Sequence, residues 1–270
     1  MKIKYSLLPR LQGLTTCEMD LFLYAARRQD DTGRVVGLYY GEVCEKMEMC
    51  KQSFYNALYS LQKKGIITIE QHTSMDYDIR ILGNDFSYRA SLSEGYINLN
   101  RSVLHSRKFQ RLKAREKWLF FEFMKITHSS HGSHQIQVRK LYEKYMQLLK
   151  VTRKVITGYL HSLKEFFSIG IKRGKYYITY KKSVFNERYY ISERKQYVSG
   201  RVKAVYRRQR IKNPADAILE ESAVMIDQYK DYAKTAGLEI WELFEHAVKK
   251  CEGAINTKYI NKLIHNAVML

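Results

Sequence analysis

Basic side chains recur at close spacing in two neighbouring stretches of the sequence, and the chemistry that they support is the binding of phosphate groups. In residues 151–164 the basic and polar side chains fall on one face of a predicted helix: Arg153, Lys154, Thr157, His161 and Lys164. In residues 169–180 they surround a glycine at the tip of a predicted hairpin: Lys172, Arg173 and Lys175. Cations placed in this way neutralise a nucleic-acid backbone and release its counterions, so the two stretches predict a phosphate-binding surface.

A third basic stretch covers residues 192–212. Its basic side chains are Arg194, Lys195, Arg201, Lys203, Arg207, Arg208, Arg210 and Lys212. A weak apolar stripe made by Val202, Val205 and Tyr206 predicts a basic helix, broken or kinked at Ser199–Gly200, that orders on DNA. The alternative is a tethered linker whose charge serves solubility.

The positive charge of the chain is local rather than general. The formal net charge is +20 and the isoelectric point is about 9.7. Residues 101–212 hold 29 Lys and Arg against 6 Asp and Glu, whereas residues 1–100 hold 12 of each and residues 213–270 hold 6 against 9. Such a field concentrates polyanions, so double-stranded DNA is the first partner to expect.

The sequence offers little for catalysis. It contains no GxxxxGK[ST] phosphate loop, and no nucleophile–base pair or carboxylate pair at a recognisable spacing. Three imidazoles close together could hold a metal ion, and His128, His131 and His134 lie in one Ser- and Gly-rich stretch. No Cys or paired carboxylate accompanies them, so a solvated loop is the simpler interpretation. We therefore predict a protein that is not an enzyme and that carries no metal or cofactor.

Compartment signals favour a cytoplasmic, nucleoid-associated protein. The sequence begins with no charged-then-apolar secretion signal, and no apolar run reaches the roughly 20 residues of a membrane helix. We expect no membrane partner. The four cysteines, Cys17, Cys44, Cys50 and Cys251, show no zinc-type pairing and are expected to stay reduced.

Local patterns in residues 1–90 predict an alternation of helices and short strands. Thr15 and Glu18 have the spacing of a capping box, and apolar residues at helical spacing follow them. The elements expected next are a strand over 35–39, helices over 41–47 and 51–64, and a hairpin of strands over 66–69 and 77–82. Gly65 marks the end of the third helix.

The segment YGEVCEKMEMCKQSFYNALYSLQKKGIITI resembles the core of the winged helix-turn-helix family. The resemblance implies that the third helix enters the major groove and that the hairpin is the wing. The outward side chains of that helix, which can bond base edges or phosphates, would be Gln52, Ser53, Tyr55, Asn56, Tyr59 and Lys63. The wing departs from the DNA-binding pattern, because Glu70, Asp76 and Asp78 put negative charge where phosphate would lie. This module either touches DNA or serves dimerisation or docking.

Residues 96–182 repeat the pattern of the first module. The run LTTCEMDLFLYAA aligns with LKAREKWLFFEFM at an offset of 98, and the predicted third helix aligns at an offset of 102, after a four-residue insertion. A repeat at this period implies two copies of one fold. The second copy carries the basic helix and the basic hairpin tip, so we expect it to supply most of the affinity for DNA.

The C-terminal residues 213–270 are small in number and mildly acidic. Asn213–Pro214 has the form of a helix start, and helices are expected near 214–235, 238–252 and 257–269. The stretch GLEIWELFEHAVKKCEGAINTKYINKLIHNAV resembles the C-terminal region of DnaD-like replication proteins of Gram-positive bacteria and their phages. Tyr259, Leu263 and Ile264 fit that pattern, whereas Ala267 stands where the family has Trp. A plain helical core is the alternative interpretation.

The combined patterns predict a mostly helical α+β protein with two tandem winged helix-turn-helix domains and a small all-α C-terminal domain. The expected boundaries are 1–90, 96–182, a basic connector helix over 183–212, and 213–270. Tandem winged helices resemble the initiators of plasmid and phage replication, so we expect a double-stranded DNA-binding protein of replication initiation. The C-terminal helices would mediate self-association, giving a homo-oligomer, or recruit a replication or transcription protein. The alternatives are a transcription regulator and an adaptor whose winged helices bind proteins.

Overall fold

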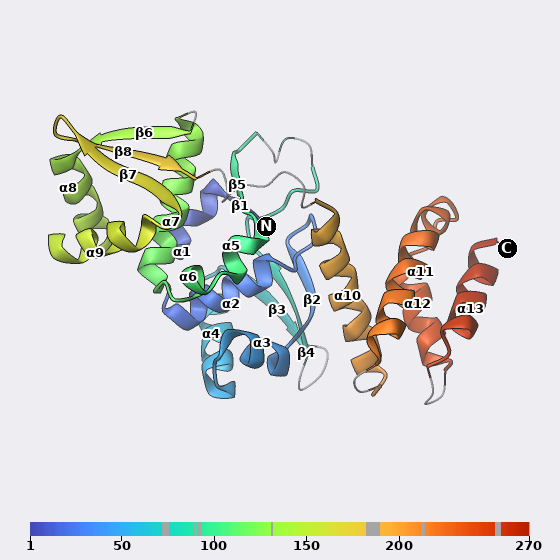
Figure 1. The fold of residues 1–270 in the computed structure, drawn as a ribbon. Coiled ribbons are helices and arrows are strands. Elements are labelled where there is room, and N and C mark those ends of the chain that lie inside the picture. Colours follow the sequence, from blue (N-terminus) through green and yellow to red (C-terminus); the bar gives the residue numbers. More distant parts are fainter. Residues whose placement is uncertain are drawn as a thin grey trace.

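The computed structural model describes residues 1–71, 76–88, 90, 93–130, 132–181, 190–211, 214–251 and 255–269. The fold is α+β and mostly helical, with 59% helix and 16% strand, small antiparallel sheets and a helical C-terminal region. Figure 1 shows two sheet-containing parts side by side and a separate group of helices beyond them, in red, that ends at the C-terminus.

The first sheet-containing part has the predicted elements in the predicted order. They are α2 (Thr16–Ala26), β2 (Arg34–Tyr39), α3 (Tyr40–Met47), α4 (Lys51–Lys63), β3 (Ile67–Gln71) and β4 (Asp76–Ile81). The capping box is confirmed, because the Thr15 amide donates to the Glu18 carboxylate at 2.6 Å and the Glu18 amide donates to the Thr15 hydroxyl at 3.4 Å. Gly65, with a φ of 66°, follows α4 where a left-handed residue ends a helix.

The second part repeats this order of elements, as the sequence offset predicts. It contains α7 (Ala114–Ser129), β6 (Ser133–Gln137), α8 (Val138–Leu149), α9 (Arg153–Leu163), β7 (Phe167–Lys172) and β8 (Lys175–Tyr180). The sheets have matching strand orders, β2–β4–β3 and β6–β8–β7, both antiparallel. The four-residue insertion lies in α8, which has 12 residues where α3 has 8. We call residues 16–81 the first repeat and residues 114–180 the second repeat.

Short elements that the sequence did not predict join the two repeats. They are β1 (Lys2–Lys4), η1 (Tyr5–Leu7), α1 (Leu8–Leu11), β5 (Tyr96–Asn98), α5 (Arg101–His105) and α6 (Arg107–Gln110). Strand β1 pairs with β5 across more than 90 residues of sequence. The indole of Trp118 on α7 donates to the carbonyl of Leu8 at 2.7 Å, which fixes α1 against the second repeat.

One hydrophobic core runs through both repeats. It contains, among others, Phe22 and Phe54 from the first repeat and Phe120 and Phe167 from the second. Lys117 on α7, whose side chain is 2% exposed, forms an ion pair with Asp20 on α2 inside this contact. Burial raises the pKa of Asp20 above its usual value, although Lys117 opposes the shift. The two repeats are therefore packed as one body rather than joined by a linker.

A second core holds the C-terminal helices together with the basic helix that precedes them. These helices are α10 (Tyr190–Arg208), α11 (Asp216–Thr235), α12 (Ile240–Lys249) and α13 (Thr257–Met269). Val202 and Tyr206 of α10 pack with Phe244 of α12 and Ile260 of α13. Burial of this stripe removes an apolar surface that the sequence had shown only weakly.

Two sequence-based expectations about this region are wrong. Helix α10 continues unbroken through Ser199–Gly200, because its apolar stripe is held against α11 and α12 on both sides of the glycine. Helix α11 begins at Asp216 with Ala215 as its N-cap, two residues later than the Asn–Pro signal indicated. Asn213 itself lies outside the described residues. No helix in the described part of the chain is long and apolar enough to cross a membrane.

Candidate nucleic-acid interface

The basic face predicted for α9 is present on the surface. Ile156, Leu160 and Leu163 are buried against the rest of the second repeat, and this fixes which side of the helix faces outward. The exposed residues of the opposite side include all five that the sequence singled out: Arg153, Lys154, Thr157, His161 and Lys164. The period of the apolar residues was sufficient to predict this face.

A network of hydroxyl groups beneath the start of α9 ties this helix to α8 and to the hairpin. The Tyr142 hydroxyl lies 3.0 Å from the Thr157 hydroxyl and 3.0 Å from the Tyr176 hydroxyl. Burial acts against it, but the bonds to Thr157, Tyr176 and Arg153 lower the pKa of Tyr142, whereas burial and the bond to Tyr142 raise that of Tyr176 to about 12. The Arg153 guanidinium stacks on the Tyr142 ring at 4.5 Å. The network orients Arg153, and the sequence gave no sign of it.

The hairpin β7–β8 presents its basic tip to solvent. Arg173 and Gly174 both have positive φ, 49° and 71°, as in the two-residue type I′ turn that suits the twist of a hairpin. Lys172 and Lys175 pair across this turn and are exposed together with Arg173. The neighbouring Ile171 is 60% exposed, which is unusual for an isoleucine and extends the tip with an apolar surface.

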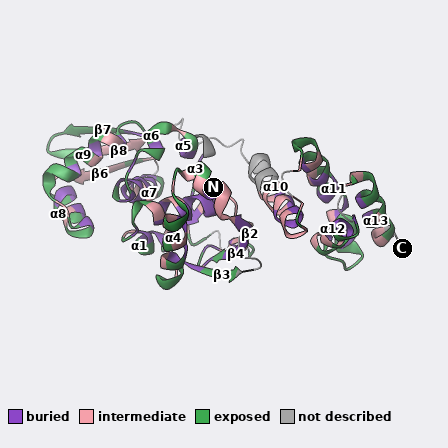
Figure 2. Cartoon of the chain, turned by 90° about the horizontal axis from the view of Figure 1, so that it is seen from below, coloured by how far each residue is buried: buried purple, intermediate pink, exposed green. Residues whose placement is uncertain are grey.

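A groove separates α9 from this hairpin. Its volume is about 310 Å³, and it is lined by Thr157, Leu160, His161, Lys164, Ile169, Gly170, Ile171 and Tyr176. The basic and polar side chains come from α9, while the absence of a side chain at Gly170 keeps the hairpin wall low. In Figure 2 the outer surfaces of α8, α9 and β7 are green, so this end of the molecule is open to a partner. The dimensions suit a single extended strand of sugar and phosphate.

The equivalent helix of the first repeat, α4, has a neutral outer face. Gln52 and Asn56 are exposed and bonded to each other, with the Gln52 amide donating to Asn56 Oδ1 at 2.8 Å. Ser53 is half-buried, because it lies in the first turn beside the thiol of Cys50, which accepts from the Ser53 amide at 3.5 Å. Tyr59 stacks on Tyr55 with ring centroids 6.4 Å apart. This face can donate and accept hydrogen bonds but carries little charge.

The acidic residues predicted on the first hairpin are buried, so the expectation of a repelling wing surface is wrong for two of the three. Asp76 and Asp78 on β4 are 2% and 3% exposed, and only Glu70 lies at the surface. Asp78 accepts from the Gly37 amide at 2.9 Å and from Arg34 at 2.9 Å. The carboxylates therefore serve intramolecular bonds in place of a charged outer face.

The partners of these carboxylates are arginines of α10. Arg208 donates to Asp78 at 2.6 Å and to Asp76 at 3.2 Å, and Arg207 donates to the Gly37 carbonyl at 2.8 Å. Burial alone would lower the pKa of Arg208, but Asp76 and Asp78 raise it, so the guanidinium stays charged. Burial raises the pKa of Asp76 above its usual value, against the effect of Arg208 and Arg207.

The remaining basic residues of α10 are also drawn inward, with one exception. Arg201 stacks on Trp241 at 4.3 Å and donates to the Tyr197 hydroxyl at 3.0 Å. Lys203 lies 3.8 Å from the Glu42 carboxylate of α3. Arg210 is exposed, with a positive φ of 62° just beyond the helix. Of the predicted basic face of α10, the structure leaves mainly Arg210 outward, because the helix is packed between the first repeat and the C-terminal helices. The side chains of Arg194 and Lys195, and all of Lys212, lie outside the described residues.

The structure thus brings some of the predicted residues together and separates others. The basic side chains of α9 and of the hairpin tip lie in one repeat, around one groove. Helix α10 lies on the far side of the first repeat from α9, as both views show (Figures 1 and 2). A continuous basic track from the hairpin to α10 is therefore not formed.

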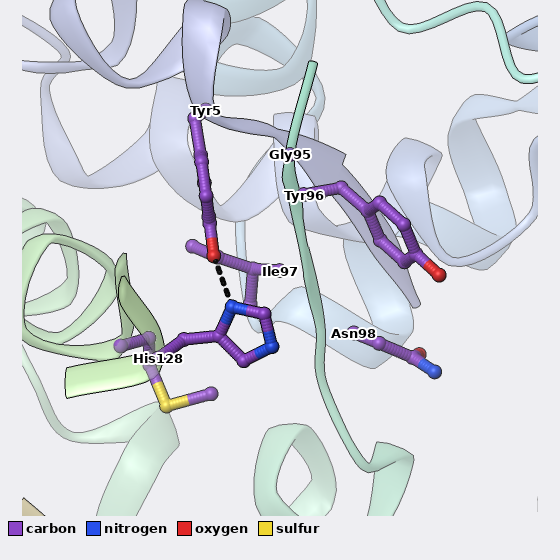
Figure 3. A pocket seen from close by; sticks show the side chains of 7 residues that line it. Tyr5, Gly95, Tyr96, Ile97, Asn98 and His128 are labelled. Carbon is purple, nitrogen blue, oxygen red and sulfur yellow. Dashed lines mark hydrogen bonds between the residues drawn. The ribbon is translucent and has the colours of Figure 1, made fainter. Parts of the chain in front are cut away.

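A tyrosine and a histidine from distant parts of the sequence meet beside a small cavity of about 210 Å³ (Figure 3). The Tyr5 hydroxyl lies 2.8 Å from Nδ1 of His128. Burial and the neighbouring Tyr96 raise the pKa of Tyr5, so the phenol remains protonated and is a poor nucleophile. The pair ties η1 to α7 rather than offering an activated group.

The histidine-rich stretch is more ordered than the predicted loop. His128 belongs to α7 and His134 to β6, where the Ser130 hydroxyl lies 3.3 Å from Nδ1 of His134. His131 lies outside the described residues. Among the described residues, no three His, Cys, Asp or Glu side chains are grouped so as to hold a metal ion.

Comparison with family models, with curated proteins and with solved structures finds no match to this chain. The functional argument therefore depends on the geometry and charge of the surfaces described above.

Proposed function

We propose that both repeats are winged helix-turn-helix domains and that the protein binds double-stranded DNA through the second of them. The observation that carries the proposal is the joint placement of a basic helix face and a basic hairpin tip on the two sides of one exposed groove. A basic helix alone is a common solvated surface. A second basic element across a groove from it matches the spacing at which a duplex presents a major groove and an adjacent phosphate strand.

In this arrangement α9 enters the major groove. Arg153 and Lys154 lie at its N-terminal end, where recognition helices contact base edges, while His161 and Lys164 line the groove beside the phosphate strand. The hairpin tip, with Lys172, Arg173 and Lys175, reaches the next phosphates or a narrow minor groove. Ile171 adds an apolar contact to sugars.

We propose that the first repeat contributes discrimination rather than affinity. The exposed amides of Gln52 and Asn56 can form paired hydrogen bonds with adenine, and neither carries charge. Arg201, Lys203, Arg207 and Arg208, assigned from sequence to the DNA face, are assigned here to internal packing of α10.

The biological role that we favour is initiation of DNA replication, for a plasmid, a phage or a chromosome. The tandem repeats and the DnaD-like pattern around Tyr259 support it, because replication initiators combine DNA-binding domains with a module that self-associates or recruits other proteins. The exposed apolar side chains of the C-terminal helices, which include Val224, Tyr232 and Tyr259, offer such a contact surface. Transcription regulation is the second candidate, since it uses the same modules.

The test is capture of sheared genomic DNA from the source organism by the purified protein at physiological salt, followed by sequencing. Peaks clustered at a replication origin support an initiator, and peaks upstream of genes support a regulator. An adaptor that binds proteins would give no enrichment, with bulk DNA retention lost as salt rises, and that result would contradict the proposed function.

A further inference from the structure

A second concentration of positive charge lies in a cavity where α10 packs on the first repeat. The cavity has a volume of about 390 Å³, within the range of small-molecule sites. It is lined by the C-terminal ends of α2 and α3, by α5 and α6, and by the middle of α10. The cationic residues that line it are Arg27, Arg28, Lys46, His105 and Lys203, and none of the described lining residues is acidic.

The nearest carboxylate only partly balances this charge. Glu42 accepts from Arg28 at 3.0 Å and lies 3.8 Å from Lys203, so one carboxylate is shared between two cations. Arg28 also stacks on the Tyr24 ring at 4.2 Å, which holds its guanidinium at the wall of the cavity. Burial, Arg28 and other nearby cations lower the pKa of Lys46, against the effect of Glu42.

The other walls of the cavity supply neutral donors and space. The Gln110 amide and the Ser199 hydroxyl line it beside the cations. Gly200 lies next to Ser199, and a Cβ placed there would meet nothing within 4 Å, so α10 has room to admit a ligand at this point. Several cations with few internal partners, together with amide and hydroxyl donors in an enclosed space, match the requirements of a phosphate group.

We propose that this cavity binds a phosphate-bearing anion and that the bound anion holds α10 against the first repeat. The shared chemistry is the phosphate group, carried either by a free compound such as a nucleotide polyphosphate or by a nucleic-acid backbone. Arg27, Arg28 and Lys46 approach it from one side and Lys203 from the other, so an anion between them replaces repulsion by attraction across the joint.

The expected consequence concerns the position of the C-terminal helices. Because Val202 and Tyr206 of α10 belong to the same core as α12 and α13, whatever fixes α10 also fixes those helices. Binding of the anion would thus couple the state of the cavity to the surface through which the protein meets its partners. This inference does not depend on the proposed DNA face of the second repeat.

The test is calorimetric titration of the full-length protein with sodium triphosphate at constant ionic strength, with thermal unfolding as a second measurement. The variant Lys46→Gln/Lys203→Gln removes two cations from the cavity, and Lys63→Gln/Lys262→Gln removes the same charge from exposed positions elsewhere. We expect saturable binding to the wild type, affinity at least tenfold weaker in the cavity variant, and unchanged affinity in the control. Ligand-induced stabilisation should fall in parallel.

A third variant separates cavity space from charge. Gly200→Met keeps every cation and points a long side chain toward the cavity, and it should weaken triphosphate binding while leaving the helix intact. Equal affinity in all four proteins, or no saturable binding to the wild type, would overturn the proposal. Addition of a 20-base-pair duplex then identifies the source of the phosphate: competition with triphosphate indicates a nucleic-acid backbone, and independent binding indicates a free phosphate compound.

Discussion

The two repeats have the same order of helices and strands but different surfaces. In the second repeat, α9 and the β7–β8 hairpin leave their cations exposed around a groove. In the first repeat, α4 presents amides and tyrosines, and the β3–β4 hairpin buries Asp76 and Asp78 under α10. The comparison shows that this architecture does not decide which face stays open to a partner. The charge at equivalent positions decides it.

The difference can be followed position by position, because α4 and α9 align at an offset of 102. Outer-face residues of α4 and their counterparts on α9 are Gln52 and Lys154, Tyr55 and Thr157, Tyr59 and His161, and Gln62 and Lys164. A neutral or aromatic side chain is thus replaced by a cation or a hydroxyl at each of these positions. The cores behind them are alike, with Phe54, Leu58 and Leu61 in one helix and Ile156, Leu160 and Leu163 in the other.

The largest expected effect comes from breaking the docking of α10 on the first repeat. Arg208→Ala leaves Asp76 and Asp78 buried without their cation, which typically costs about 3 kcal/mol of unfolding free energy. Arg210→Ala, two residues further along and exposed, should change it by less than about 0.5 kcal/mol. Urea unfolding of both variants measures the difference.

A second variant checks that docking, and not charge alone, is lost. Gly37 has a φ of 73°, and a Cβ added there would lie 2.1 Å from Cβ of Ala204 on α10. Gly37→Ala should therefore push α10 away from β2 and expose the C-terminal helices to limited proteolysis. Resistance to protease equal to that of the wild type, in both Gly37→Ala and Arg208→Ala, would show that α10 is not held in this way.

The proposed division between affinity and discrimination predicts an effect on base selection. Removing the amides in Gln52→Ala/Asn56→Ala should weaken binding to a captured target site by about 2 kcal/mol, on the order of 1 kcal/mol for each side chain. The salt dependence should not change, because neither side chain is charged. If binding to target and random duplexes is unaltered, the first repeat is a protein-docking module instead.

The turn at the tip of the second hairpin offers a smaller, geometric test. Gly174 has a φ of 71°, so Gly174→Ala forces a side chain into the left-handed region at a cost of about 1 kcal/mol and distorts the placement of Arg173. Gly170→Ala, in the same hairpin without a positive φ and with open space around it, is the matched control. Duplex affinity should fall only in the first variant.

The smallest expected effect is the pH dependence of the capping box at the start of α2. Burial opposes it, but bonds from Lys64, Ser60 and the Thr15 amide lower the pKa of Glu18 below its usual 4.5. A lowered carboxyl pKa stabilises the fold above the unfolded-state value and loses that contribution as the pH falls. Glu18→Gln should therefore cost about 1 kcal/mol at pH 7, and the difference from wild type should shrink below pH 4.5. Guanidinium unfolding as a function of pH measures this.

Sequence patterns predicted those elements whose signals are local. The capping box at Thr15, the apolar period of α9 and the glycine at 174 each specify their own neighbourhood, and the observed boundaries lie within about two residues. The strands β1 and β5 escaped because three residues are too few to show a period, and their pairing joins positions 2–4 to positions 96–98.

The role of α10 could not be predicted, for a related reason. Its arginines resemble a solvated basic face until Arg208 is seen beside Asp76 and Asp78, about 130 residues earlier in the chain. Those carboxylates in turn resembled a charged hairpin surface. The one available signal was their complementarity, since an acidic hairpin and a basic helix in the same chain are candidate partners. The hydroxyl network around Tyr142 left no pattern in the sequence at all.

The central claim, that the second repeat and not the first supplies the DNA-binding charge, is tested most directly by the salt dependence of duplex binding. Wild type should be compared with Arg153→Ala/Lys154→Ala/Lys172→Ala/Arg173→Ala and with the charge-matched Lys63→Ala/Lys249→Ala/Lys258→Ala/Lys262→Ala, by fluorescence anisotropy over a range of salt. We predict that the first variant lowers the slope of log K against log salt by about 4, one for each lost phosphate contact, while the control retains the wild-type slope within about 1. Equal slopes in the two variants would contradict the account, because the charge of the second repeat would then act no differently from charge elsewhere on the surface.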